Sequence, residues 1–234
     1  MPNIEDMVVC LINKNYSNYD IYWYGITGSY ARSENREWSD VDVVLCVNDI
    51  ESPYEEFLEF NKLNFDITVI GENHIDRLLD IERRSCRATL LTKLAQLMIL
   101  YDPKKHGEHA KNKANEYLNS GSVPERELQI SIRLNLMSAI SAAKKTKNLK
   151  EQRLAALNLF FKMHLAHTIN ANSWVGITPF MLNYYSAEQD QDISSLLQLF
   201  FDCFSADDIG ALIYDAEGLL SRIGGSVKSG RFKL

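Results

Sequence analysis

The sequence of 234 residues lacks the features that would assign it to a membrane or secreted class. Its longest apolar runs, at 40–47 and 94–101, are far too short to span a bilayer, and two aspartates interrupt the first. The opening residues MPNIED are acidic where a signal peptide would be basic. We therefore expect a cytoplasmic protein with no membrane partner.

Paired cysteines and an excess of positive charge are also missing. The four cysteines (10, 46, 86 and 203) lie far apart, without metal-ligand spacing or the density of a disulfide scaffold, so reduced thiols are expected. The net charge of −6 disfavours broad nucleic-acid binding, because that affinity comes chiefly from lysine and arginine. Nucleic-acid binding by a local basic groove remains an alternative. Neither a dinucleotide-binding nor a P-loop glycine motif occurs in the required context.

What the chain does contain is a change of pattern near residue 121. Before it, β-rich runs at 19–27, 39–48, 64–70 and 98–102 alternate with stretches of helical spacing at 4–14, 73–85, 86–97 and 106–118. A short helix is expected within 53–61. After the breaker GSVP at 121–124, helical spacing predominates, at 125–147, 149–170, 179–185, 192–204 and 206–222. The pattern predicts an α+β fold, with a mixed sheet and helices in residues 1–120 followed by an all-α bundle in residues 121–234.

Two aspartates in the second predicted strand carry the first chemical signal. Asp40 and Asp42 are two residues apart, so in a strand both face the same side, with Cα atoms roughly 6.5 to 7 Å apart. Val41, Val43 and Leu45 then face the other side. Two carboxylates in contact repel by about 1 to 4 kcal/mol in a watery or surface-like dielectric. Mg²⁺ reverses that cost, because it binds through one or two carboxylates together with substrate phosphates.

A glycine-serine turn precedes these aspartates. Gly28 permits close backbone approach, the Ser29 hydroxyl can donate a hydrogen bond, and a helix starting near Tyr30 would direct its positive N-terminal end toward phosphates. Arg32 follows the turn and is a candidate for steadying a triphosphate, although a solvated arginine on a helix face fits equally well.

A third acid lies in the next predicted strand. Asp66 is flanked by apolar residues, and beside Asp40 and Asp42 it would complete a cluster of three carboxylates able to hold two metal ions about 3.5 to 4 Å apart. Asp66 is also a candidate base for an incoming hydroxyl, in competition with the other acids of 51–59.

Together these residues resemble a known superfamily. Gly28-Ser29, ten intervening residues, Asp40-Val-Asp42 in a hydrophobic strand and a later Asp66 resemble the nucleotidyltransferase superfamily typified by DNA polymerase beta. The motif resemblance covers about residues 19–71, and the helical remainder is similar in layout to small-molecule nucleotidyltransferases such as aminoglycoside-modifying enzymes. The resemblance implies that Gly28 and Ser29 bind phosphates, that Asp40 and Asp42 hold both metals, and that Asp66 is a metal ligand or base.

The resulting hypothesis is a magnesium-dependent enzyme that transfers a nucleoside monophosphate from a triphosphate, ATP being favoured, to a hydroxyl of a small molecule, with release of pyrophosphate. Two alternatives stay open. One is a toxin-like nucleotidyltransferase whose acceptor is a protein or a tRNA, although the acidic charge balance disfavours tRNA. The other is a nucleotide-binding protein without catalysis. No motif in the helical half identifies the acceptor.

Overall fold

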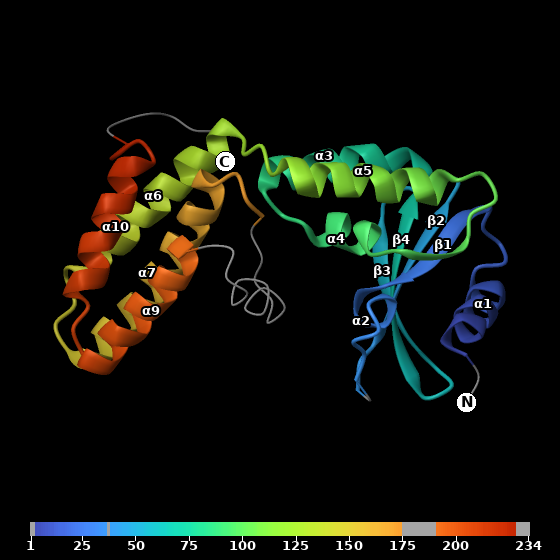
Figure 1. Ribbon diagram of the computed structural model, residues 1–234, viewed down its shortest axis with the longest axis horizontal. Coiled ribbons are helices and arrows are strands. Elements are labelled where there is room, and N and C mark those ends of the chain that lie inside the picture. The colour runs from blue at the N-terminus through green and yellow to red at the C-terminus, as the bar shows by residue number, and fades with distance from the viewer. Residues whose placement is uncertain (1–2, 37, 175–190, 228–234) are drawn as a thin grey trace. The chain divides into compact units, whose positions relative to one another are not determined.

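The computed structural model describes residues 3–36, 38–174 and 191–227, and the chain divides into two compact units (Figure 1). The first unit comprises Met1–Arg83 and Ala88–Ser120, and the second comprises Arg84–Arg87 and Gly121–Leu234. Within the described residues, no helix is long and apolar enough to cross a membrane. A mixed sheet with helices is followed by a helical region, which confirms the predicted α+β class.

The first unit is built on a five-stranded sheet with the strand order β3-β4-β2-β1-β5. Strands β2 and β4 are parallel, whereas the other neighbouring pairs are antiparallel. Its elements are α1 (Ile4–Asn15), β1 (Ile21–Thr27), α2 (Gly28–Ala31), β2 (Val41–Val47), β3 (Tyr54–Phe60), β4 (Leu63–Gly71), the 3₁₀ turn η1 (Glu72–His74), α3 (Ile75–Ser85), α4 (Thr89–Ala95), β5 (Met98–Tyr101) and α5 (His106–Ser120). The predicted edge strand after residue 97 is therefore confirmed as β5.

Successive side chains along each strand point to opposite faces of the sheet. Val41, Val43 and Leu45 pack in a core with the apolar side of α1, as their spacing predicts. The opposite face is covered by α5, and Lys113 of α5 pairs with Asp76 of α3 at 2.7 Å, so these helices are neighbours; Figure 1 shows both running over the sheet. There Trp23 of β1 is fully buried, and a Cβ on Gly107 of α5 would be 3.0 Å from its ring. The side chains of Asp42 and Asp66 belong to this second face.

The prediction of a short helix within residues 53–61 is wrong, because this segment forms strand β3. Leu58 and Phe60 pack against the α1 core, and Glu56 of the same side accepts a hydrogen bond from the hydroxyl of Tyr16. Strand β3 is an edge strand, where glutamates remain hydrated and discourage pairing with another chain. The three glutamates of this segment therefore signal a polar edge, not a helix.

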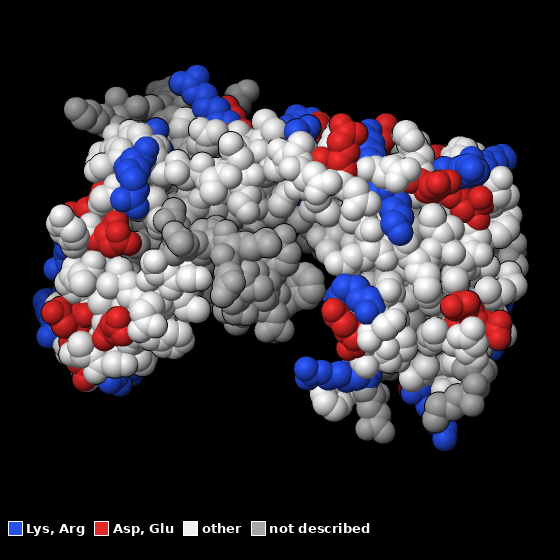
Figure 2. Space-filling view, viewed as in Figure 1, with Lys and Arg blue, Asp and Glu red and all other residues white. Residues whose placement is uncertain are grey.

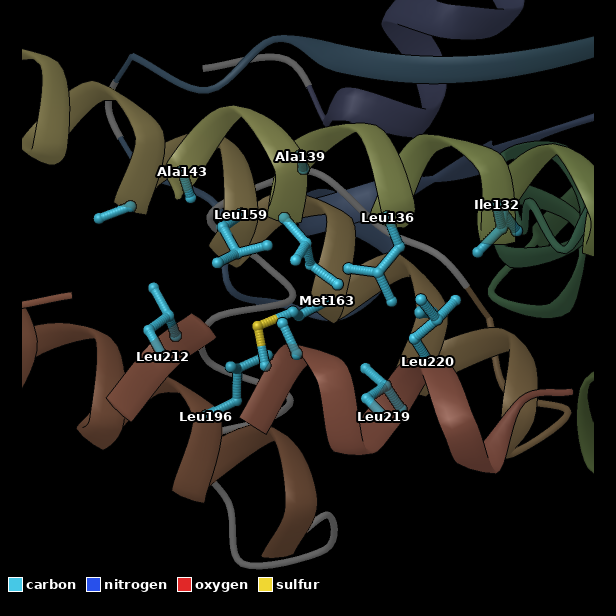
Figure 3. Close-up of a cluster of buried hydrophobic side chains, with 14 of the residues drawn as sticks. Ile132, Leu136, Ala139, Ala143, Leu159, Met163, Leu196, Leu212, Leu219 and Leu220 are labelled. Carbon is cyan, nitrogen blue, oxygen red and sulfur yellow. The ribbon is translucent and has the colours of Figure 1, made fainter. Parts of the chain in front are cut away.

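The second unit is a helical bundle of the kind predicted. Its described helices are α6 (Arg126–Ala143), α7 (Leu149–Asn170), α9 (Gln191–Ala206) and α10 (Gly210–Arg222). Their inward-facing residues form one apolar core, with Leu136, Leu159, Met163 and Leu212 fully buried near its centre (Figure 3). The helix predicted at 179–185 lies outside the described residues. All four cysteines are free and three of them are buried, as expected for reduced thiols.

Candidate active site

The candidate site is a row of residues that crosses four adjacent strands. Thr27 is the register partner of Asp42, Asp42 of Asp66, and Asp66 of Phe57. Neighbouring strands lie about 4.8 Å apart, and register partners point to the same face, so the Asp42 and Asp66 carboxylates are side by side. Phe57 ends the row at the sheet edge with a ring that is 72% exposed.

Gly28 brings the backbone against the first of these carboxylates. It directly follows β1, has a φ of 66°, and begins the single-turn helix α2. A Cβ at this position would stand 2.1 Å from Oδ2 of Asp42, which no real side chain can do. Both the backbone conformation and the space therefore require glycine. Ser29 follows at once in α2, so the glycine-serine turn and Asp42 do lie together.

Asp40 and Arg32 lie at the margin of the row. Asp40 is exposed and immediately precedes β2 rather than belonging to it. Its charge is close enough to raise the pKa of Asp42. Arg32 follows α2, where it bonds to Glu34 at 2.7 Å and to Oε1 of Gln96 at 2.6 Å. The positive charge of Arg32 still lowers the pKa of Asp42, so it faces the same region.

The electrostatics of Asp42 are those of a crowded carboxylate. Burial raises its pKa most strongly, and the negative charges of Asp66 and Asp40 raise it further. The ammonium of Lys93 and, less strongly, the guanidinium of Arg32 act in the opposite direction. The net effect is a raised pKa, chiefly because burial disfavours the charged form of Asp42. A cation bound beside the carboxylate would offset this cost.

Lys93 is a member of the site that the sequence gave no reason to single out. It comes from α4, and its side chain is 17% exposed. The ammonium donates to Oγ1 of Thr68 at 2.8 Å and lies 3.4 Å from Oδ2 of Asp66. The backbone of Lys93 is also held, because its carbonyl accepts a 2.6 Å hydrogen bond from the fully buried hydroxyl of Thr27. Helical spacing in 86–97 predicts α4 but not which sheet residues this lysine reaches.

Asp42 and Asp66 supply carboxylate oxygens, which are the ligands that a hard divalent cation takes. Oδ1 of Asp66 is buried and has no hydrogen-bond partner among the described residues, which is costly unless a ligand satisfies it. Within the described part of the chain, no group of three or more His, Cys, Asp or Glu side chains is arranged to hold a metal. The three aspartates are thus not a preformed cage. Mg²⁺ needs fewer protein ligands, since one or two carboxylates and substrate phosphates commonly suffice.

A groove of about 330 Å³ opens beside the row. It is lined by Thr68 and Ile70 of β4, together with Glu55 of β3 and Lys93 of α4. Glu82 of α3 also lines it, and its two carboxylate oxygens accept 2.8 Å hydrogen bonds from the amides of Leu90 and Leu91 in the first turn of α4. Because Lys93 contacts Asp66 as well, the groove and the carboxylate row share this side chain.

Charge is mixed on the one face of the surface that Figure 2 shows. On the face shown in Figure 2, the Lys and Arg side chains of the described residues are interspersed with Asp and Glu rather than gathered into one broad basic area. With a net charge of −6, this distribution gives no support on that face to a large nucleic-acid footprint.

The fold has a counterpart among solved structures. A nucleotidyltransferase-like protein from Exiguobacterium sibiricum matches 94% of this chain and 75% of its own, with a TM-score of 0.53 and 10% sequence identity. The likeness is one of fold. No protein-family model matches the sequence. No curated protein matches it either.

Proposed function

We propose that the chain is a nucleotidyltransferase that moves a nucleoside monophosphate from a nucleoside triphosphate, with ATP favoured, to a hydroxyl group. One observation carries the proposal: two half-buried carboxylates, Asp42 and Asp66, stand side by side, and a Cβ added to Gly28 would be 2.1 Å from Oδ2 of Asp42. A structural role would not explain such a crowded pair, because it costs stability. The fold of a nucleotidyltransferase-like protein supports the same proposal.

In this proposal each residue has a task that its position suits. The amides at the start of α2 and the hydroxyl of Ser29 bind phosphate oxygens, since the first amides of a helix have no partner within it. Asp42 and Asp66, with Asp40 beside them, hold Mg²⁺, and two ions are expected. Bound there, the metal would lower the pKa of the attacking hydroxyl and offset charge on the phosphates. Arg32 adds positive charge on the phosphate side.

The reaction balances as a single displacement. The acceptor hydroxyl oxygen forms a bond to the α-phosphorus, the bond from that phosphorus to the bridging oxygen breaks, and pyrophosphate leaves with the electron pair. The hydroxyl proton passes to a base, for which Asp66 is the candidate. A small molecule is the proposed acceptor. The mixed surface charge and the groove beside Asp66 favour it over tRNA.

The test is transfer of label from an α-labelled triphosphate, with each of the four nucleotides, in the presence of Mg²⁺ and a cell extract. Label should appear in the small-molecule fraction and require Mg²⁺. Asp42→Asn and Asp66→Asn should each lower transfer by about 100-fold or more, a magnitude typical of losing a group that stabilises the transition state. Asp76→Asn is the matched control, since it removes an exposed carboxylate of the same unit that pairs with Lys113 rather than with a residue of the row.

Each outcome of this test has a definite meaning. Label on protein or tRNA would replace the small-molecule acceptor with a macromolecule while keeping the chemistry. Nucleotide binding without transfer to any fraction would indicate a binding protein without catalysis. Transfer that continues at the original rate in both aspartate variants would show that the reaction, if any, takes place elsewhere.

A further inference from the structure

The ammonium of Lys93 is hydrogen-bonded to Thr68 and only loosely paired with Asp66, so another cation can replace it beside that carboxylate. Its short contact is with a neutral group, the Thr68 hydroxyl at 2.8 Å, whereas both carboxylates, Asp66 and Glu55, lie 3.4 Å from the ammonium. A tightly formed pair between an ammonium and a carboxylate measures about 2.7 to 2.9 Å. The ammonium is therefore anchored by threonine and placed between two acids without being committed to either.

We propose that Lys93 is an internal counterion of the carboxylate row, which holds Asp66 while the site is empty of nucleotide and turns to the polyphosphate when a divalent cation takes its place. The inference rests on the proposed function, because it concerns the same carboxylates. Lys93 is a positioning residue in this account: it acts on the metal through Asp66 and on the nucleotide through charge.

Coulomb's law gives the reason for this exchange. An ammonium next to Asp66 and a divalent ion on the same carboxylate repel each other, so Lys93 weakens binding of the bare metal. A polyphosphate supplies enough negative charge to attract both cations. Metal and nucleotide are therefore expected to enter together, and the metal alone to bind poorly.

The surroundings of Lys93 allow the movement that this requires. The four-carbon stem of lysine is flexible, while the Thr27 hydroxyl fixes the backbone from which it extends. The side chain also borders the groove of about 330 Å³, which leaves space beside the ammonium. The Lys93 ammonium can thus move without any change in α4 or in the sheet.

The experiment measures binding of Mn²⁺ alone, by electron paramagnetic resonance, and separately of Mg²⁺ with a non-hydrolysable triphosphate, by calorimetry. Lys93→Met should bind Mn²⁺ about tenfold more tightly than the original protein and the nucleotide complex about tenfold less tightly. Lys93→Arg keeps the charge and should restore weak binding of the bare metal. Lys113→Met is the matched control: it removes a lysine of similar exposure, 24% against 17%, that pairs with Asp76 outside the site.

The Mn²⁺ measurement needs no turnover, so it separates this inference from the proposed function. A gain in Mn²⁺ affinity that Asp66→Asn abolishes supports the counterion role, even if no acceptor is ever labelled. Unchanged or weaker Mn²⁺ binding in Lys93→Met overturns that role, even if the original protein transfers nucleotide. Absence of Mn²⁺ binding in every variant, Lys93→Met included, overturns the counterion role, and the label-transfer experiment then decides the proposed function by itself. If circular dichroism shows Lys93→Met to be unfolded, Lys93→Gln, which can still bond to Thr68, is measured in its place against the same criteria.

Discussion

Gly28 lies so close to Asp42 that a Cβ added to the glycine would stand 2.1 Å from Oδ2 of the aspartate. The turn proposed to bind phosphate and the carboxylate proposed to bind metal are therefore in direct contact. Any change at residue 28 must displace Asp42, and this makes the glycine a sensitive probe of the site.

Gly28→Ala is expected to abolish binding of the metal–nucleotide complex and to destabilise the first unit. Gly225→Ala is the control, because Gly225 has nearly the same φ, 68° against 66°, but no atom within 4 Å of the added Cβ. The positive φ alone costs about 1 to 2 kcal/mol. Denaturant unfolding should show a larger loss for residue 28 than for residue 225. Equal decreases in unfolding free energy for the two variants would mean that the contact with Asp42 contributes nothing to the cost of Gly28→Ala.

Asp42→Asn is expected to stabilise the protein at neutral pH while removing activity. Burial raises the pKa of Asp42, so in the pH range where carboxyl groups titrate the folded state binds more protons than the unfolded state. The contribution of Asp42 to the free energy of unfolding therefore falls as pH rises through that range. The asparagine variant lacks this loss. Its advantage in unfolding free energy over the original protein should therefore grow from acidic to neutral pH, in urea titrations without metal. An advantage that shrinks over the same interval would contradict this account of Asp42.

Thr27→Val is expected to destabilise the first unit by about 1 to 3 kcal/mol, the cost of leaving a buried hydrogen-bonding group without its partner. The lost bond is the 2.6 Å contact from Thr27 to the carbonyl of Lys93. Thr168→Val is the comparison, since Thr168 is equally buried but bonds to the carbonyl of His164 within its own helix. The effect at residue 168 should be smaller. Thermal unfolding of both variants measures the difference.

Leu159→Ala is expected to destabilise the helical unit by about 2 to 5 kcal/mol, because it leaves a cavity in a packed core. Leu159 is fully buried near the centre of the cluster in Figure 3. Leu154 lies on the same helix but is 62% exposed, so Leu154→Ala should change the unfolding free energy by about 0.5 kcal/mol or less. Similar losses in the two variants, measured by urea denaturation, would be incompatible with the burial described for α7.

The sequence predicts those parts of the site that depend on local pattern. Asp42 and Asp66 are found because each is an acid in an otherwise apolar strand, on the face opposite the residues that fill the α1 core. Gly28 is found because it ends a strand next to a serine. The proposal that these residues bind metal and nucleotide remains a prediction.

The parts that local pattern does not predict arise from tertiary structure. Lys93 reaches Thr68 and Asp66 only because α4 packs beside β4, and helical spacing contains no information about that neighbour. Phe57 joins the row for a similar reason: its segment is an edge strand, whose glutamates resemble a polar helix in sequence. The alternation of residues along one strand can be recognised in that segment alone, but the pairing of two strands cannot be predicted from either segment by itself.

Strands β2 and β4 pair residue for residue, from Val41 with Phe65 to Val47 with Gly71. A slip of β4 by one position would turn Asp66 toward α1 and bring Phe65 and Ile67 to the opposite face in its place. Misaligned molecules could then be compact yet unable to capture a ligand. The fraction of refolded protein that takes up metal and nucleotide would thus count the chains that have aligned these strands correctly, which makes ligand capture a direct assay of folding fidelity.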